Sequence, residues 1–339
     1  MRVYLTGATG FVGSNIARVF TERHGAELFC PVRESRPPAG APYDWAVTDV
    51  RDASAVAGSV RSARPDVIVH AAILNDFRRL YTDRRDSWAS YVVATRNLVD
   101  AANAVGAHVV LVSTDWVFDG TQSGATEDTP PNPINLYGFL KAASELVVTE
   151  RAEGGAVARI SGVNGVHWAR PETPRRQDAG FGYLVASIAE ALGAGQRFTV
   201  WQSPEINTVA TPTLASDAAE SLWRLAELGR EGVFHCCGGE SVDRAALARL
   251  TAEELELDPE LLDFGPPDPE QLPPAPVPYD TSLDSRATAA ALGTERVDVR
   301  TMLRRMRFQL EHGELGPAAA PAQEGAQEPA AARLPRLST

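Results

Sequence analysis

A threonine, a tyrosine and a lysine occupy positions from which they can move a proton. Thr114 follows an apolar run, and Tyr137 and Lys141 stand four residues apart in a segment of helical character. Residues at this spacing share one face of a helix. A phenol is a poor acid or base at neutral pH, and a neighbouring ammonium lowers its pKa. We therefore predict that Tyr137 gives a proton to a carbonyl oxygen as hydride arrives at carbon, while Thr114 donates a hydrogen bond and Lys141 holds ribose hydroxyls.

Lys141 is the only lysine among 32 basic residues. Arginine replaces lysine wherever the two are equivalent, but it cannot replace a compact ammonium. The survival of this one lysine favours special chemistry at Lys141. The alternative is a chance survivor, with Tyr137 and Lys141 as a surface pair on an amphipathic helix.

A glycine-rich turn, TGATGFVG, spans residues 6–13, directly after a short apolar run and before a helical segment. Gly7 permits the tight turn, Gly10 lets the backbone approach a pyrophosphate, and Gly13 lets the helix pack closely on the strand. The helix N-terminus offers unpaired N–H groups and a positive dipole end to phosphates. A merely structural turn is the alternative. The residues expected to contact a dinucleotide here are Gly7, Thr9, Gly10, Phe11, Val12 and Gly13.

The end of the second predicted strand discriminates between NADP and NAD. An arginine there accommodates the 2′-phosphate of NADP, whereas an acidic residue binds the 2′-hydroxyl of NAD. The sequence reads CPVRES over residues 30–35. Arg33 and Ser35 favour NADP, while Glu34 keeps NAD possible. A solvated Arg33 is the alternative.

Further cofactor contacts are expected at the ends of the third and fourth strands. Asp49-Val50 can receive the adenine amino group and cover its ring, whereas Asp52 equally suits the N-cap of the following helix. Ala71-Ala72 is small enough to let a ribose approach. His70 is expected to be a packed histidine rather than an acid or base.

Strand-like and helical segments alternate along the first half of the chain, which predicts an α/β fold with a Rossmann-type doubly wound parallel sheet. We expect an NADP-binding domain over residues 1–160, with helices around 205–230 packing on it. A smaller C-terminal domain over residues 161–314 is expected to bind mainly substrate. The Ala/Pro-rich residues 315–339 are expected to be disordered. The predicted strands are 2–5, 27–32, 66–70, 108–113, 156–160 and 232–237, and the predicted helices are 11–24, 85–105, 135–153, 183–192, 217–228 and 297–310.

The composition limits the class of partner. A net charge of −12 argues against nucleic acid and anionic membrane surfaces, although an anionic small substrate needs only a few local cations. The apolar runs are too short to span a membrane and no signal peptide is recognisable, so a cytoplasmic location is expected. Cys30, Cys236 and Cys237 lack metal-ligand spacing and are expected to be buried free thiols.

Several longer strings resemble the extended short-chain dehydrogenase/reductases, and within them the dTDP-4-dehydrorhamnose reductase-like, sugar-nucleotide-binding branch. The resemblance covers roughly residues 1–312, and STDWVFDG from Ser113 is its most specific string. EDTPPNPINLYGFLK from Glu127 joins a substrate loop to the helix of Tyr137 and Lys141. The other strings are TGATGFVG, TDVRD, HAA, TRNLVDAA, GVFHCCGGESV and DTSLDSRA.

The resemblance implies a catalytic set of Thr114, Tyr137 and Lys141. It implies NADPH-dependent reduction of a keto group on a nucleotide-activated sugar, as in deoxysugar biosynthesis. It places Asp115 and Trp116 near the sugar, and it allows a homodimer.

Four positions depart from the family pattern. Tyr91 stands where members carry an asparagine that supports the active site. Trp116 replaces a tyrosine and Gly162 replaces a bulky aromatic, both near the sugar in the family, so the sugar itself is open to change. Asn15 replaces a glutamate that binds metal between subunits of some members, so we predict no metal there.

A nucleotide diphosphate would need cations from the C-terminal half, because a guanidinium grips phosphate bidentately. We select Arg176 and Arg197, and at least half of the candidates are expected to be solvated surface residues. Trp168 and Trp201 can stack on a base or sugar, with plain packing as the alternative. The full set of candidate cations is Arg170, Arg175, Arg176 and Arg197.

Three other functions stay open. A nucleotide-sugar epimerase would hold NAD tightly, which Arg33 opposes. A reductase of a non-sugar carbonyl in specialised metabolism is allowed by Gly162 and Trp116. A non-catalytic, cofactor-binding regulatory subunit is opposed by the intact catalytic set and favoured by Tyr91.

Overall fold

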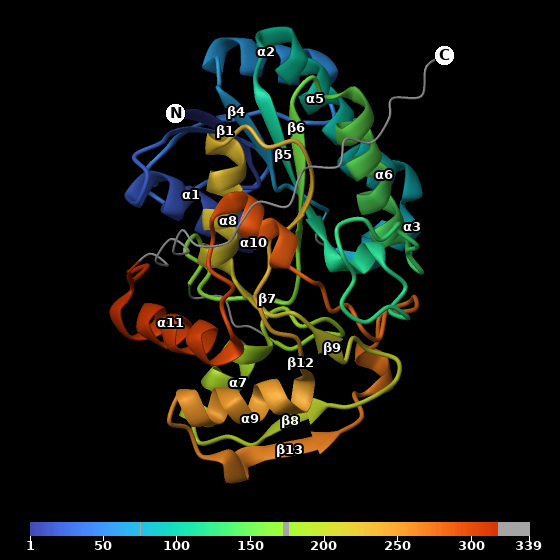
Figure 1. Cartoon of the computed structure of the whole chain (residues 1–339), viewed down its shortest axis with the longest axis vertical. Helices are drawn as coiled ribbons and strands as arrows, with labels where there is room; N and C mark the ends of the chain where they lie inside the picture. The colour runs from blue at the N-terminus through green and yellow to red at the C-terminus, as the bar shows by residue number, and fades with distance from the viewer. Residues whose placement is uncertain (75, 172–175, 318–339) are drawn as a thin grey trace.

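The computed structural model describes residues 1–74, 76–171 and 176–317. Its centre is a seven-stranded sheet in the order β11-β6-β5-β4-β1-β2-β3, and every neighbouring pair is parallel (Figure 1). This sheet confirms the predicted Rossmann-type α/β fold. Its strands are β1 (Arg2–Thr6), β2 (Glu27–Val32), β3 (Asp44–Val47), β4 (Val67–His70), β5 (His108–Thr114), β6 (Gly155–Ile160) and β11 (Gly232–His235).

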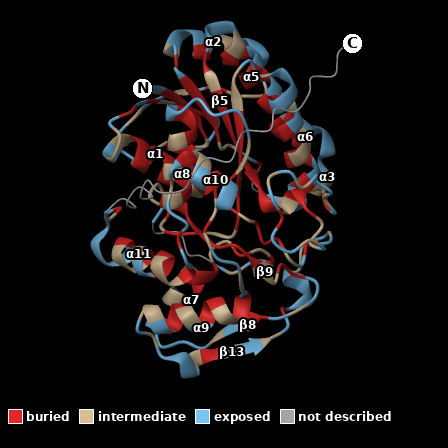
Figure 2. Ribbon diagram, in the orientation of Figure 1, coloured by how far each residue is buried: buried red, intermediate tan, exposed pale blue. Residues whose placement is uncertain are grey.

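Helices cover both faces of the sheet. On one face α1 and α8 pack against each other and on alternate strand residues such as Val3 and Leu5. On the other face α2, α5 and α6 cover the intervening residues, including Tyr4. Figure 2 shows that the strands are largely buried. Because both faces of the sheet are covered, the strand sequences are near-continuous apolar runs. The helices are α1 (Phe11–Glu22), α2 (Ala53–Ala63), α5 (Ala94–Val105), α6 (Leu136–Arg151) and α8 (Ala215–Glu227).

The segment predicted as one helix over residues 85–105 is divided in three. α4 (Arg84–Trp88) leads into a single π-helical turn, Ala89–Val93, and α5 follows. The short α3 (Phe77–Thr82) precedes them. A π turn inside a helix inserts an extra residue and often marks a functional site. Here it carries Tyr91, which stands where the resembled family has an asparagine.

A smaller lobe lies below the sheet in Figure 1. Its core is formed by α7, α9 and α11 together with the strand pair β8–β13. The sequence predicted α7 and α11 but neither α9 nor the helix α10. β13 lies within the proline-rich run 258–278 and is not among the strands that the sequence predicted. The elements are α7 (Leu184–Gly193), α9 (Arg244–Glu254), α10 (Arg286–Leu292), α11 (Val299–His312), β7 (Val163–Asn164), β8 (Phe198–Trp201), β9 (Val209–Ala210), β10 (Thr213–Leu214), β12 (Val242–Asp243) and β13 (Leu262–Gly265).

The end of the described chain is packed rather than free. Leu315 is buried, and its carbonyl accepts hydrogen bonds from Arg23 and Gln309. The carbonyl of Gly316 accepts a second bond from Arg23 at 3.0 Å. The prediction of disorder is therefore wrong for Leu315 and Gly316, because the Leu315 side chain packs in the apolar core. Residues 318–339 of that expectation lie outside the described residues.

None of the helices in the described ranges is long and apolar enough to cross a bilayer.

Candidate functional site

Two cavities open side by side where β1, β4, β5 and β6 end. We call the first the glycine-turn cavity, because the turn between β1 and α1 forms its floor; its volume is about 500 Å³. It brings together twelve of the residues predicted to bind a cofactor. They are Gly7, Thr9, Gly10, Phe11, Val12, Gly13, Arg33, Ser35, Asp49, Val50, Ala71 and Ala72.

The glycine turn leaves no room for side chains. A Cβ on Gly7, whose φ is +78°, would lie 2.8 Å from the amide nitrogen of Ala72, and a Cβ on Gly13 would lie 2.0 Å from the carbonyl oxygen of Gly7. The Thr6 hydroxyl fixes the neighbouring strand end, since it accepts from the amides of Ala71 and Ala72 at 3.2 and 3.1 Å. The backbone is thus set close to whatever phosphate group enters the cavity.

His70 supports the same strand end from inside the protein. It shares a 2.7 Å hydrogen bond with the Thr6 hydroxyl and is buried. Burial, together with the charge of Lys141, lowers the pKa of His70 to about 3. This neutral, packed histidine is the one that the sequence predicted.

Arginine side chains line the far end of the glycine-turn cavity. Arg33 is half exposed and lies 3.1 Å from Glu34, the residue that had kept NAD possible. Arg51 holds the Asp49 carboxylate in a fork, with Nε–Oδ distances of 2.9 and 3.0 Å, and also pairs with Asp86. This fork holds the pKa of Asp49 below its usual value. The sequence interpretation missed Arg51, although it directly follows Asp49-Val50.

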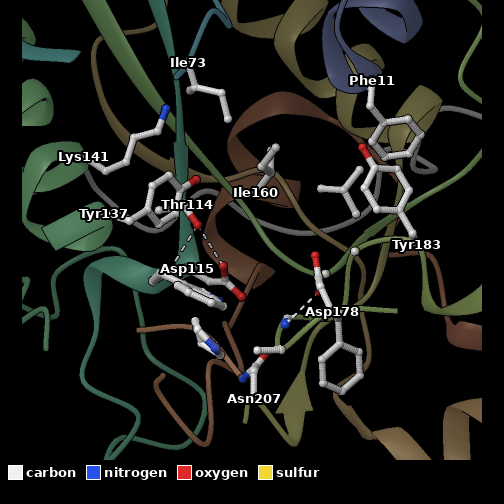
Figure 3. Close-up of a pocket in the computed structure, with 18 of the residues that line it drawn as sticks. Phe11, Ile73, Thr114, Asp115, Tyr137, Lys141, Ile160, Asp178, Tyr183 and Asn207 are labelled. Atoms are coloured by element: carbon white, nitrogen blue, oxygen red, sulfur yellow. Dashed lines mark hydrogen bonds between the residues drawn. The ribbon is translucent and has the colours of Figure 1, made fainter. Parts of the chain in front are cut away.

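The second cavity, which we call the tyrosine cavity, has a volume of about 460 Å³. Thr114, Tyr137 and Lys141 line it on one side, with Phe11 and Tyr183 on the opposite side (Figure 3). The two cavities adjoin each other, since they share lining residues. The residues that line both are Phe11, Val12, Ala71, Ile73, Leu74 and Tyr183.

Lys141 is turned toward the strand rather than toward the Tyr137 hydroxyl. Its Nζ donates to the carbonyl of Val112 at 2.8 Å and lies 5.7 Å from the centre of the Tyr91 ring. Burial lowers the pKa of Lys141 to about 8, and the Glu145 charge opposes this.

Burial has the largest effect on the pKa of Tyr137. Desolvation raises the pKa of Tyr137 to about 12; a hydrogen bond with Thr114 lowers it and the Asp115 charge raises it. The prediction that Lys141 lowers this pKa is therefore wrong, because burial and the Asp115 charge both raise it and only the hydrogen bond with Thr114 opposes them. At neutral pH Tyr137 is a protonated phenol that can serve as a proton donor.

Asp115, predicted to touch substrate, lines the tyrosine cavity but is anchored within the protein. Its carboxylate accepts from Thr281 at 2.6 Å, from Ser161 at 2.8 Å and from Thr114 at 3.0 Å. Burial raises its pKa, and these three hydroxyls oppose the shift. Asp115 thus accepts the hydroxyl hydrogen of Thr114 in a hydrogen bond.

Aromatic rings surround the Tyr137 side chain. Trp116, also predicted at the substrate, stands edge to face with Tyr137 at a centroid distance of 5.9 Å. Tyr91 does the same from the π turn at 6.1 Å. These contacts hold the phenol ring in one orientation across the cavity.

The opposite wall was not predicted. Asp178 borders the tyrosine cavity on a loop held by Arg244, a buried arginine at the start of α9. The Arg244 guanidinium donates to the carbonyls of Asn207 at 2.8 Å and Asp178 at 2.7 Å, and also to that of Gly180. Desolvation raises the pKa of the Asp178 carboxyl, while Arg244 opposes the rise. No local motif marks this pair, because 66 residues separate its members.

The candidate phosphate-binding arginines are scattered. Arg170 lines the glycine-turn cavity, and Arg176 borders a separate hollow of about 560 Å³ beside Trp201. Arg197 is not brought to either cavity, because its exposed guanidinium forms a fork with Asp263. Arg175 lies outside the described residues.

Trp168 and Asn15 form a packed pair away from the tyrosine cavity. The indole nitrogen of Trp168 donates to the Asn15 side chain at 3.0 Å, and the Arg18 guanidinium lies 3.9 Å above the indole ring. Trp168 therefore packs within the protein, which was the alternative to stacking on a base or sugar.

Comparison with known proteins identifies relatives of two kinds. The chain is 28% identical over 290 residues to methionine adenosyltransferase 2 subunit beta of Xenopus tropicalis, covering 84% of this chain and 80% of that one. It is 28% identical over 300 residues to dTDP-4-dehydrorhamnose reductase of Mycobacterium tuberculosis, covering 86% and 87%.

Solved structures share the fold. That of dTDP-4-dehydrorhamnose reductase from Bacillus anthracis, in complex with NADP, superposes with a TM-score of 0.72 at 20% identity and covers 91% of this chain and 99% of that one. Residues 1–311 match the family described as RmlD substrate binding domain. This confirms the resemblance drawn from the sequence strings: the chain belongs to the RmlD substrate binding domain family.

Proposed function

We propose that the chain is an NADPH-dependent oxidoreductase that reduces a keto group on a nucleotide-activated sugar. One observation carries the proposal: Thr114, Tyr137 and Lys141 line a cavity that adjoins the glycine-turn cavity and shares lining residues with it. A dinucleotide held in the glycine-turn cavity would therefore reach the acid–base groups of the tyrosine cavity.

The residues present fit NADP. The glycines admit a pyrophosphate, since a Cβ at Gly7 or Gly13 would collide with backbone. Arg33 and Ser35 provide donors for a 2′-phosphate, and Arg51 adds a second guanidinium at the same end. When bound, NADPH supplies the hydride. The NADP in the Bacillus anthracis relative supports this choice, and the cytoplasm, where thiols stay reduced, is the proposed location.

The chain's own residues supply the proton and the orientation. Tyr137 donates its phenolic proton to the carbonyl oxygen, and the hydrogen bond from Thr114 to Asp115 fixes the threonine side chain beside it. In this proposal the Lys141 ammonium holds the ribose hydroxyls of the bound dinucleotide. The shape of the cavity between Tyr137 and Asp178 then selects the carbonyl that is reduced.

The nucleotide would lie in the hollow that contains Arg176 and Trp201. This hollow adjoins the tyrosine cavity, since Asp178 and Gln271 line both. A guanidinium for phosphate and an indole for the base are the two contacts that such a ligand requires. Arg197, engaged by Asp263, is not part of this proposal.

The test is NADPH oxidation with a panel of 4-keto sugar nucleotides, with aldehydes and simple ketones alongside. Tyr137→Phe should lower turnover by about 10²- to 10⁴-fold, the usual share of a general acid, while NADPH affinity stays within about twofold. If only a simple ketone is turned over, the substrate is a non-sugar carbonyl compound and not a nucleotide sugar.

A second candidate is a cofactor-binding subunit without catalysis. The relatives named methionine adenosyltransferase 2 subunit beta favour it, as does Tyr91 in place of the family's asparagine. This candidate predicts tight NADPH binding and no turnover with any carbonyl. It also predicts that the chain binds a methionine adenosyltransferase catalytic subunit, which size-exclusion chromatography of the mixture would detect.

A further inference from the structure

Lys141 and Glu145 of α6 bind two consecutive residues of β5 and so hold the helix against the strand. They lie one helical turn apart on the same face of α6. Lys141 Nζ donates to the Val112 carbonyl at 2.8 Å, and the Ser113 hydroxyl donates to Glu145 Oε1 at 2.5 Å. Thr114 is the next residue of the strand. The two contacts therefore fix the strand end from which Thr114 faces Tyr137.

Glu145 is held from the other side by Arg159 on β6. The guanidinium grips both carboxylate oxygens, with Nε–Oε1 at 3.0 Å and Nη2–Oε2 at 2.8 Å, and only 2% and 5% of the two side chains are exposed. Arg159 is paired in register with Ser113 in the sheet. Beyond it, His235 lies 3.4 Å from the guanidinium, and burial keeps the pKa of that histidine below its usual value.

The ion pair is costly to bury, because two charges leave water and their attraction repays this only with good geometry. Lys141 adds a second buried cation beside it. Tyr137, a protonated phenol at neutral pH, shares the helix face of Lys141. The Tyr91 ring lies beside the ammonium, and His70 is neutral because its pKa is about 3. The Glu145 carboxylate, one helical turn along α6, opposes the lowering of the Lys141 pKa by burial.

We propose that Glu145 is a positioning residue of the site: its carboxylate keeps Lys141 as an ammonium and, through Ser113 and Arg159, locks the strand end that carries Thr114. The proposal rests on the proposed function in one respect, namely that Lys141 serves the bound dinucleotide and Tyr137. The charge arrangement itself can be measured without any reaction.

The test uses the single lysine. The full chain labelled with ¹³Cε-lysine gives one lysine side-chain signal, whose pH titration reports Lys141 directly. In Glu145→Gln the midpoint should fall by about one pH unit or more from the wild-type value near 8, and NADPH affinity at neutral pH should weaken about tenfold. Gln keeps the size of the side chain and an oxygen that can accept from Ser113. Ser113→Ala, which removes that hydrogen bond but leaves the charge, should move the midpoint by less than about 0.3 unit.

A purely structural role predicts a different pattern. Glu145→Gln would then lower the melting temperature and leave the lysine midpoint unchanged, which would overturn the proposal. Glu145→Gln also leaves Arg159 without its partner, so Glu145→Gln/Arg159→Met, which removes both charges, serves as the second variant. A downward shift is expected in it as well, smaller than in Glu145→Gln because the unpaired Arg159 cation is also gone. An unshifted midpoint there would equally refute the idea. Because this readout needs no carbonyl substrate, absence of reductase activity would refute the proposed function and leave the role of Glu145 standing.

Discussion

Tyr91 stands edge to face against Tyr137, with ring centroids 6.1 Å apart and ring planes at 81°. Its hydroxyl donates to the Leu74 carbonyl at 3.1 Å, and its face lies 5.7 Å from Lys141 Nζ. A ring therefore supports both candidate acid–base residues at the position where the family resemblance implies a side-chain amide. The π turn that carries Tyr91 brings this bulk to the cavity wall.

This contact predicts that the ring of Tyr91 matters more than its hydroxyl. Tyr91→Phe should cost about 1 kcal/mol of unfolding free energy, for one lost hydrogen bond, and should keep turnover within about threefold. Tyr91→Ala should cost about 3–5 kcal/mol, because it removes a buried ring beside Tyr137. Urea denaturation and initial rates measure both. A large loss of turnover in Tyr91→Phe would instead assign the hydroxyl to proton transfer.

The buried lysine predicts the pH dependence of the reaction. Lys141, whose pKa falls from 10.5 to about 8, is an ammonium below that pH and neutral above it. Tyr137 keeps its proton until about pH 12. Carbonyl reduction should therefore fall as pH rises through about 8, by about tenfold per unit, although the phenol remains protonated. Initial rates between about pH 6 and about pH 10 test this; a rate that is constant up to pH 10 would contradict a role for the ammonium.

Arg33 predicts the choice of cofactor. Arg33→Ala should weaken NADPH binding by about 10- to 100-fold, as expected for a lost charge-assisted hydrogen bond to phosphate, and NADH binding by less than about threefold. Arg36→Ala is the matched control, because Arg36 is an exposed arginine three residues on that does not line the cavity. Fluorescence titration with both nucleotides measures the four affinities. Equal losses for NADPH and NADH would exclude a phosphate contact.

The glycine turn predicts a steric effect. Gly13→Ala should abolish dinucleotide binding and destabilise the fold, because its Cβ would lie 2.0 Å from the Gly7 carbonyl oxygen. Gly58→Ala in α2, where no atom lies within 4 Å of a Cβ, should stabilise the fold by about 0.5–1 kcal/mol and leave binding unchanged. Thermal melts with and without NADPH distinguish the two. Normal binding by Gly13→Ala would mean that the turn can open.

The sequence by itself determined the parts of this protein that depend on local geometry. The glycine spacing after β1, the alternation of strands and helices, and the four-residue step from Tyr137 to Lys141 are each set within a few residues. Backbone sterics and helical periodicity act at that range, so the turn, the sheet and the shared helix face could be predicted.

Only the tertiary structure decided which charges meet. Arg244 reaches Asp178 across 66 residues, Arg159 reaches Glu145 across 14, and Arg197 is taken by Asp263 instead of a phosphate. The same holds for the acidity of Tyr137, where burial and the Asp115 charge together raise the pKa against a hydrogen bond with Thr114. Long-range packing sets both burial and ion pairing, and no local pattern encodes them. The sequence therefore predicted which candidate acid–base groups share one helix face, whereas the fold set their charge states and their partners.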